Sequence, residues 1–490
     1  MNTDIVSKLW NYCHELRHIG VNNNDYLEQI TCLLFLKMAD ERGIELPNYE
    51  TLDPISKKPI TVACDWPTLN KQSGSDLITH YTYVLTELAN HPGMLGDIFA
   101  RAQNRIDQAT SLKKLLGLID SEQWTEMGVD VTGQAFEGLL EKAASEGKKG
   151  AGQFFTPRPL IQSMVRCVKP DPRGHRTFAI GDPAVGTGGF LVAAYEWLFA
   201  QSGGAFERDT AKRVKTSTYF GQEIDQKPRR LALMNLYLHN VEPHIVIGDS
   251  IYETPTNQRY DVILTNPPFG TKGANQAPDR DDFVVSTSNK QLNFLQHILT
   301  ILKPGGRAAV VVPDNVLFAQ QAGDVFKVLM EDCDVHTVLR NTRGTFSPYT
   351  EGTQTNVIFF TKGRPTERTW IYDARANVPK ITKRSRPLTD AAFVDFERCF
   401  GDDPDGRSKR AESDSADDRW RSFEIDDVRA RHFKLDAFKW LRDEELDDPD
   451  DLPEPEELIT EAMEEIQLAL DGLADLQKLL EVGSGEIADA

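Results

Sequence analysis

Apolar residues in the first part of the chain recur with the spacing of helices. The pattern is clearest in YLEQITCLLFLKMADERG, where Ile30, Leu33, Leu34 and Leu36 stand among good helix formers and Gly43 ends the run. Helical patterning continues to about residue 145. We therefore predict an all-helical N-terminal domain over residues 1–145.

From about residue 150 the pattern changes to short β-rich runs that alternate with helical ones. The helical runs GFLVAAYEWLFAQ and KPRRLALMNLYLHN are long enough to cross over between neighbouring strands. This alternation predicts a doubly wound, Rossmann-like α/β domain over residues 146–365, with a parallel sheet covered on both faces. The seven expected strands are TFAIGD, TYFGQEID, HIVIGDS, YDVILTNPPF, GRAAVVVPD, VHTVLRN and TNVIFFTK.

The C-terminal part separates into a polar stretch and an apolar heptad. Residues 400–420 hold almost no aliphatic side chains, so we predict an extension and flexible linker over residues 366–425. Beyond a Pro-rich run, apolar residues recur every seven positions, at Ile459, Ile466, Leu473 and Leu480. This helical segment, residues 426–490, either docks on its own chain or pairs with a partner subunit.

Composition narrows the class of protein. The chain has 490 residues, of which 40% are hydrophobic, and no apolar run approaches the ~18 residues that a membrane span needs. The N-terminus lacks a secretory signal, so we expect a cytoplasmic protein without membrane contact. The six cysteines and ten histidines show none of the usual metal-ligand spacings, so we expect no metal.

The formal net charge of -20 bears on the choice of partner. Neutralising DNA phosphates requires clustered Lys and Arg. A chain this acidic either does not act on DNA or relies on another subunit to hold it. Basic residues do gather locally, at Lys212, Arg213 and Lys215, whereas acidic residues concentrate from Asp402 onward.

The first candidate site is the glycine-rich run IGDPAVGTGGF, residues 180–190, where a strand should end and a helix begin. Gly186, Gly188 and Gly189 allow a tight turn and a close approach of the backbone to a ligand. Asp182 adds a carboxylate beside the amides of the helix N-terminus. Such a site suits a ligand that carries both an ammonium and a carboxylate, such as the methionine part of S-adenosylmethionine.

Two further acidic residues end the next two expected strands. Glu223 in YFGQEID could accept hydrogen bonds from both ribose hydroxyls, and Asp249 in IVIGDS could accept from an adenine amino group. In open α/β sheets ligands bind at the carboxyl ends of the strands. We therefore expect Asp182, Glu223 and Asp249 to line one edge of the sheet.

The most specific motif is Asn266-Pro267-Pro268-Phe269, directly after the strand YDVILT. Adenine N6 is a poor nucleophile because its lone pair is delocalised, so two acceptors must hold its hydrogens out of the ring plane. The Asn266 side-chain oxygen and the Pro267 carbonyl can be those acceptors, since consecutive prolines stiffen the turn. Phe269 offers a face on which an extruded base can stack.

These residues resemble the adenine-N6 DNA methyltransferases, and the segment GQFFTPRPLIQSMV, residues 152–165, narrows the resemblance to the modification subunit of Type I restriction-modification systems. The resemblance implies a seven-stranded methyltransferase fold and a site-specific, adenine-specific DNA methyltransferase. It implies that S-adenosylmethionine is bound by Gln153, Phe155, Thr156, Asp182, Ala184, Gly186, Thr187, Gly188, Gly189, Glu223 and Asp249. The target adenine would be held by Asn266, Pro267, Pro268 and Phe269.

The resemblance also implies partners. Members of the family work on double-stranded DNA as two modification subunits with one DNA-specificity subunit, and an ATP-dependent restriction subunit can join them. Two other functions stay open on the residues alone. Asn-Pro-Pro-Phe also serves methyltransferases that act on a protein glutamine amide, and a catalytically inactive assembly subunit would keep the same fold.

Overall fold

A computed structural model describes most of the chain and divides it into two compact units. The first unit spans residues 1–374 and 380–440, and the second spans residues 375–379 and 441–490. Every helix and strand of the described residues belongs to the first unit. None of these helices is long and apolar enough to cross a membrane. The described residues are 23–53, 56–124, 156–269, 277–346, 353–382, 385–412 and 418–441.

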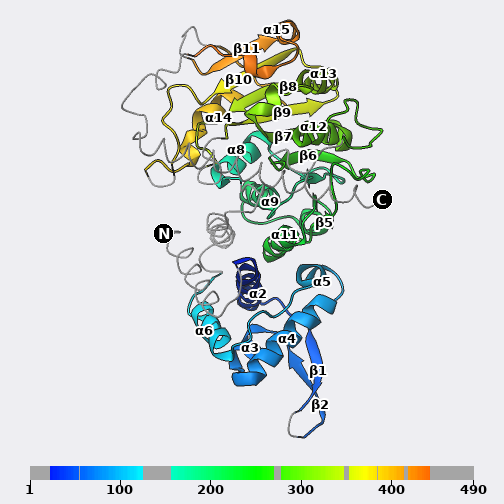
Figure 1. Cartoon of the computed structure of the whole chain (residues 1–490), viewed down its shortest axis with the longest axis vertical. Helices are drawn as coiled ribbons and strands as arrows, with labels where there is room; N and C mark the ends of the chain where they lie inside the picture. The colour runs from blue at the N-terminus through cyan, green and yellow to red at the C-terminus, as the bar shows by residue number, and fades with distance from the viewer. Residues whose placement is uncertain are drawn as a thin grey trace, which may run out of the picture. The chain divides into compact units, whose positions relative to one another are not determined.

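The N-terminal part is mainly helical, as the apolar spacing predicted (Figure 1). The helix α2 (Asn23–Glu41) is buried along most of its length, and it ends before Gly43, whose φ is +64°. The large side chains Trp66, Tyr81 and Phe99 fill the core beside it. The other helices are α3 (Trp66–Lys71), α4 (Gly74–Asn90), α5 (Met94–Phe99) and α6 (Ala109–Asp120).

One hairpin interrupts these helices, so the prediction of an all-helical N-terminal domain is wrong on this point. The strands β1 (Asn48–Leu52) and β2 (Pro59–Ala63) pair in antiparallel fashion. Among the residues of β1 only Tyr49 is buried, and its hydroxyl lies 2.7 Å from Nδ1 of His80 on α4. Strands of five residues with one anchored side chain carry too little periodicity to be recognised from the sequence.

Nine strands of the described chain form one sheet, in the order β11-β10-β8-β9-β7-β6-β3-β4-β5. All seven strands expected from the sequence are present, so the doubly wound α/β fold is confirmed. The strand β9 runs antiparallel to both of its neighbours, so the sheet is mixed rather than parallel. The seven are β3 (Ile180–Asp182), β4 (Tyr219–Glu223), β5 (His244–Ile247), β6 (Tyr260–Thr265), β7 (Leu302–Pro313), β8 (Cys333–Arg340) and β9 (Thr355–Lys362).

Two strands extend the sheet beyond residue 365, where we expected an extension and flexible linker. The strands β10 (Arg368–Asp373) and β11 (Trp420–Glu424) pair with each other, and β10 pairs with β8. Trp370 stacks on Trp420 with ring centroids 5.0 Å apart. The polar residues before β11 also make defined contacts, because Arg410 donates to the carbonyl of Phe400 and packs over its ring. A few aromatic contacts thus order a polar segment, and the prediction of a linker is wrong for them.

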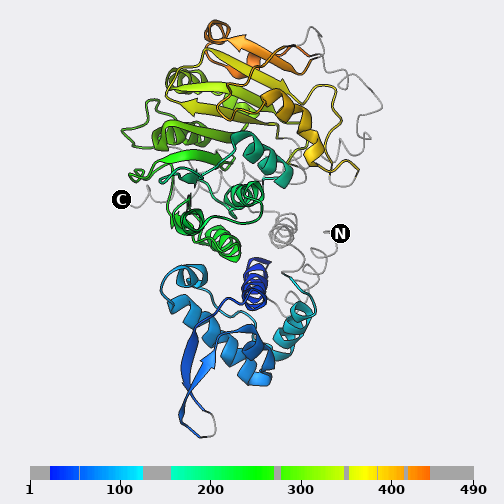
Figure 2. The ribbon, with the colours of Figure 1, turned by 180° about the vertical axis from the view of Figure 1, so that it is seen from behind.

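Helices cover both faces of the sheet (Figures 1 and 2). In β6, Val262 and Leu264 join one apolar cluster and Ile263 joins the other, because successive side chains of a strand point to opposite faces. The helices α8 (Arg158–Val168), α9 (Gly189–Gln201) and α11 (Gln226–Leu238) pack with the first cluster, and α12 (Lys290–Ile301) and α13 (Ala322–Asp332) with the second. The crossover helices expected from the sequence are α9 and α11, and the polar stretch between α9 and β4 contains α10 (Arg208–Thr216).

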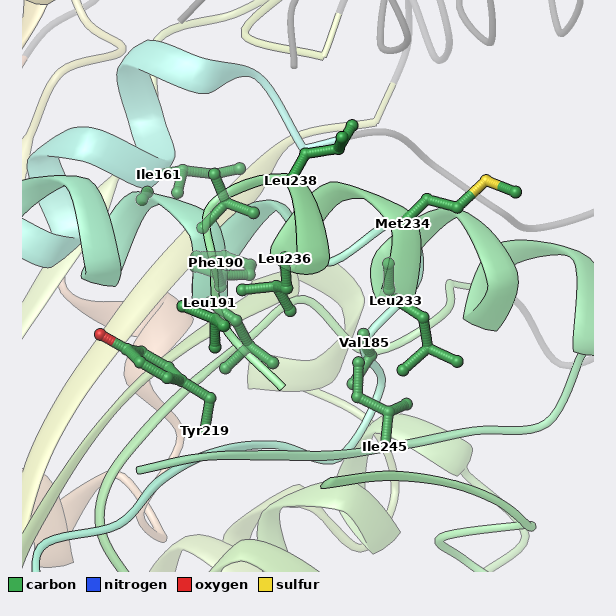
Figure 3. Close-up of a cluster of buried hydrophobic side chains, with 14 of the residues drawn as sticks. Ile161, Val185, Phe190, Leu191, Tyr219, Leu233, Met234, Leu236, Leu238 and Ile245 are labelled. Atoms are coloured by element: carbon green, nitrogen blue, oxygen red, sulfur yellow. The ribbon is translucent and has the colours of Figure 1, made fainter. Parts of the chain in front are cut away.

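The first cluster lies directly behind the glycine-rich run. Figure 3 shows Val185 close to Leu233 and Ile245, and Phe190 and Leu191 close to Leu236. All six side chains are at most 4% exposed. The loop after β3 is therefore held on a rigid apolar base.

The start of the expected C-terminal helical segment packs on the sheet. Arg340 of β8 is buried and donates to the carbonyls of Leu435 and Phe438. It also pairs with Asp373 at 3.2 Å. The expected heptad, Ile459, Ile466, Leu473 and Leu480, lies outside the described residues.

Candidate active site

Four parallel strands bring the expected site residues to one edge of the sheet. The strand β3 pairs with β4 on one side and with β6 on the other, and β4 pairs with β5. Strands β4 and β5 thus follow β3 on one side of it, and β6 lies on its other side, so the order of strands reverses at β3. In open α/β sheets, ligands bind at such switch points. The carboxyl ends of these strands carry Asp182, Glu223, Asp249 and Asn266.

The glycine-rich loop after β3 depends on two positive φ angles. Gly186 has a φ of +54°, and Gly188 has a φ of +83° and caps the N-terminus of α9. A Cβ at Gly188 would lie 3.1 Å from Cβ of Ala232, so α11 packs against this part of the loop. At Gly186 the added Cβ would meet nothing within 4 Å, so only the backbone conformation favours glycine there. The loop therefore offers open space beside Gly186 and close packing behind Gly188.

Asp182 is 1% exposed, and the hydrogen bonds that it accepts from the described residues go to one of its two oxygens. Its Oδ1 accepts from the amide of Ala184 at 3.0 Å and from the hydroxyl of Thr265 at 2.7 Å. Among the described residues, no donor reaches its buried Oδ2. Burial raises the pKa of Asp182 to about 7, helped by the nearby Glu223 and opposed by the two hydrogen bonds. A buried acceptor with no donor is costly, so this position suits a ligand that brings an N–H or a positive charge.

Glu223 ends β4 and faces the same loop. Its Oε2 accepts from the amide of Gly186 at 2.8 Å, and its Oε1 accepts from the amide of Asp225 at 3.1 Å. Burial raises the pKa of Glu223 above its usual range. Each carboxylate oxygen has a second lone pair, so both can accept a further donor, such as a hydroxyl.

Asp249 lies in the loop after β5. Its Oδ1 accepts from the amides of Ile251 and Tyr252, which fixes the turn. The next residue, Ser250, donates from its hydroxyl to the carbonyl of Pro183 at 2.6 Å. The loop that carries Asp249 is therefore tied to the loop that follows Asp182.

The turn after β6 holds the Asn-Pro-Pro-Phe motif. Nδ2 of Asn266 donates to Oγ1 of Thr156 at 2.8 Å, while its Oδ1 is buried and has no partner among the described residues. The carbonyl of Pro268 accepts from Nε2 of Gln291 on α12 at 2.8 Å. The ring of Phe269 lies edge-on to the buried Phe346, with centroids 5.8 Å apart. The turn is thus held by side chains from three other parts of the chain.

One contact joins the motif to the glycine-rich side of the site. Thr265 directly precedes Asn266, and its hydroxyl donates to Asp182 across 83 residues of sequence. Because β3 and β6 are neighbouring strands, the two candidate regions meet at this pair. A buried acceptor at Asp182 and another at Asn266 therefore lie at the ends of adjacent strands.

Arg280 connects the segment after the motif to the Asp249 loop. It donates to the carbonyls of Ser250 and Ile251 and pairs with Asp282 at 2.6 Å. Its guanidinium also lies beside His297, whose pKa burial lowers to about 3 with the help of that positive charge. Arg280 therefore ties its own segment to the loop that carries Asp249 and to α12.

The remaining residues that we expected to bind the cofactor do not all belong to the contacts described above. Gln153 and Phe155 lie outside the described residues. Ala184 contributes its amide to Asp182, Thr187 is half-buried in the loop, and Gly189 is the first residue of α9. Across the part of the chain that the structure describes, no group of three His, Cys, Asp or Glu could hold a metal ion.

Sequence reasoning missed Thr265, Gln291 and Arg280. Thr265 adjoins the motif, but threonine is ordinary in a strand, and nothing local marks the other two. Each acts through a partner that is distant in sequence.

Two family models match the chain. The model described as N-6 DNA Methylase matches residues 127–448, and the model described as HsdM N-terminal domain matches residues 5–120. The two models meet between residues 120 and 127, about twenty residues before the change of pattern that the sequence shows near residue 145. Together they span most of the chain.

Curated proteins resemble the chain over its whole length. The Type I restriction enzyme StySJI methylase subunit of Salmonella typhimurium is 37% identical over 535 residues, covering 100% of this chain and 97% of that protein. The Type I restriction enzyme EcoKI methylase subunit of Escherichia coli K12 is also 37% identical, with the same coverage.

Solved structures agree with these similarities. The crystal structure of the EcoKI M protein is 33% identical, with a TM-score of 0.55, and the match covers 97% of this chain and 96% of that one. A Type I methyltransferase subunit from Streptococcus thermophilus has a TM-score of 0.67 at 19% identity, covering 89% of this chain and 98% of that one. The second match bears on the fold alone.

Proposed function

Because this chain belongs to the methylase subunits of Type I restriction enzymes, we propose that it transfers a methyl group from S-adenosylmethionine to N6 of adenine in DNA. The observation that carries the proposal is the pair of buried acceptors, Asp182 Oδ2 and Asn266 Oδ1, which have no donor among the described residues. The Asp182 oxygen suits a cation, and the Asn266 oxygen suits the hydrogens of an amine. Thr265 joins the two strand ends on which they stand.

The residues of the glycine-rich side fit S-adenosylmethionine. Asp182 would hold the ammonium of the methionine part of S-adenosylmethionine, near the open space beside Gly186. Glu223 has lone pairs left for the ribose hydroxyls, and Asp249 stands one strand further for the adenine. When bound, S-adenosylmethionine supplies a methyl group activated by a positive sulfur.

The Asn-Pro-Pro-Phe turn would bind the target base, flipped out of the duplex. Asn266 Oδ1 and the Pro267 carbonyl accept the two N6 hydrogens and so free the nitrogen lone pair. The carbonyl of Pro268 already accepts from Gln291, which leaves the preceding carbonyl for the base. In the transfer the bond from N6 to the methyl carbon would form as the methyl–sulfur bond breaks, the sulfur would keep the electron pair of that bond, and the proton released from N6 would pass to solvent. Positioning of this kind contributes about 7 to 11 kcal/mol.

Partners would supply the grip on DNA. With a formal net charge of -20, the chain is poorly suited to hold DNA alone. We propose that two copies bind one DNA-specificity subunit, and that an ATP-dependent restriction subunit can join them. The expected site of action is the cytoplasm.

The test uses the chain in complex with its specificity subunit, duplex DNA and labelled S-adenosylmethionine. Mass spectrometry of the digested DNA should show N6-methyladenine. Asn266→Ala should lower the methylation rate about a hundredfold or more while cofactor binding persists. Asn104→Ala, which removes a half-buried amide in the N-terminal part that contacts Thr82 and the amide of Ile106, should leave the rate unchanged. Label found in a glutamine of a protein instead of in DNA would overturn the proposal.

A further inference from the structure

We propose that Thr156 is a positioning residue for the transfer: it fixes the side-chain amide of Asn266 so that the oxygen, and not the nitrogen, faces the target amine. This inference rests on the proposed function. The observation behind it is a single contact, in which Nδ2 of Asn266 donates to Oγ1 of Thr156 at 2.8 Å across 110 residues of sequence.

The amide of Asn266 needs such a contact because its two ends have nearly the same shape and opposite hydrogen-bonding roles. A rotation about the last side-chain bond would exchange the oxygen for a nitrogen that only donates. A donor facing the N6 hydrogens would repel them. Thr156 accepts from the nitrogen, so the buried Oδ1, which no donor of the described residues reaches, is the end of the amide left for the base.

Thr156 is well placed to hold a fixed position. It lies two residues before α8, whose inner side chains Leu160 and Met164 are fully buried. The first residue of that helix, Arg158, pairs with Glu196 of α9 at 2.7 Å. The segment that carries Thr156 is therefore tied, through Arg158, to the helix that begins at the glycine-rich loop.

The backbone of the turn is held separately. Gln291 is 2% exposed and donates to the carbonyl of Pro268. The rigid prolines and this bonded carbonyl restrain the backbone of the turn but leave the side chain of Asn266 able to rotate. Thr156 restrains that freedom. A hydroxyl that accepts from Asn266 also keeps its own hydrogen for another acceptor, so the contact is compatible with the cofactor role expected for Thr156.

The two roles predict different kinetics. Loss of a cofactor contact would raise the dissociation constant for S-adenosylmethionine. Loss of amide positioning would lower kcat and leave cofactor binding nearly unchanged, because Asn266 acts on the base.

The first experiment compares Thr156→Val with Thr156→Ser in the complex with the specificity subunit. Valine has nearly the same shape as threonine but cannot accept a hydrogen bond from Asn266. We therefore expect kcat to fall about tenfold, the usual effect of one lost hydrogen bond. Serine keeps the oxygen and should restore most of the rate. The dissociation constant for S-adenosylmethionine, measured by calorimetry, should stay within about twofold in both variants.

The matched control is Thr82→Val. Thr82 is exposed on α4, and its hydroxyl accepts from Nδ2 of Asn104 at 3.3 Å, the same kind of contact away from the site. This variant should methylate at the wild-type rate. Thermal melting of all variants checks that each is folded.

The second experiment removes the need for orientation. In Asn266→Asp both ends of the side chain are acceptors, so adding Thr156→Val to that background should change its single-turnover rate less than about twofold. A tenfold loss in both backgrounds would overturn the proposal. So would a Thr156→Val enzyme with normal kcat, or one whose only defect is weaker cofactor binding. A wild-type complex that does not methylate adenine would instead overturn the proposed function itself.

Discussion

Cofactor binding should weaken steeply as the pH falls below about 7, because Asp182 must lose its proton to hold a cation. Its carboxyl is 1% exposed, and burial raises its pKa to about 7. A bound ammonium favours the ionised carboxylate, so affinity is full above this pKa and is lost as the pH falls through it.

The magnitude follows from this pKa. Well below pH 7 the dissociation constant should rise about tenfold for each pH unit, since each unit makes the ionised form about ten times rarer. With a pKa of about 7, the protonated fraction predicts a rise of about sixteenfold between pH 7 and pH 5.5. This is a loss of about 1.6 kcal/mol of binding free energy.

The assay is calorimetric titration of the complex with S-adenosylmethionine from pH 5.5 to pH 7.0. Up to pH 7 an α-amino group with a pKa of about 7.7 to 8.0 is still mostly protonated, so the charge of the ligand changes little. Asp182→Asn should bind weakly at every pH and lose most of the slope. Glu223→Gln serves as the comparison, because the pKa of Glu223 is also raised by burial; it should keep the slope.

Two results would refute the reasoning. One is a dissociation constant that stays level down to pH 5.5 in the wild-type complex. The other is a pH dependence that survives in Asp182→Asn and disappears in Glu223→Gln, which would assign the titration to the other carboxyl.

Two further predictions concern the framework of the site. Gly188→Ala should lower the free energy of unfolding by about 1 to 3 kcal/mol and weaken cofactor binding. The φ of +83° at this position strains any L side chain, and the new Cβ would press on Ala232. Urea unfolding measures the first effect and calorimetry the second. Arg280→Ala should lower the free energy of unfolding in urea by about 2 to 4 kcal/mol, because two carbonyls and Asp282 lose a buried partner. Arg429→Ala, which removes an exposed ion pair, should change it by less than about 0.5 kcal/mol. Equal losses in the two variants would contradict the role of burial.

The sequence by itself determined the elements around the site. Apolar runs of strand length located all seven expected strands, and glycine and proline located the two loops, since both residues restrict the backbone locally. The order of acidic residues at strand ends was also enough to place Asp182, Glu223 and Asp249 at one edge. These features could be read because each depends on residues that are neighbours in the chain.

Elements with weak local patterns were predicted wrongly. The hairpin of β1 and β2 is short, and β11 follows a polar run that carries no apolar period. What orders β11 is the stacking of Trp420 on Trp370, fifty residues earlier by the sequence numbering. Burial of a few large aromatic rings offset the entropy cost that composition alone suggested.

Only the tertiary structure decided how the site is held. The contacts of Thr265 with Asp182, of Asn266 with Thr156 and of Gln291 with Pro268 span 83, 110 and 23 residues. A pattern of polar and apolar residues predicts where helices and strands form. The pairing of side chains depends instead on which strands become neighbours in the sheet. Asp182 Oδ2 and Asn266 Oδ1 are the acceptors at the site that this pairing leaves without a donor from the described residues, and no local signal marks them.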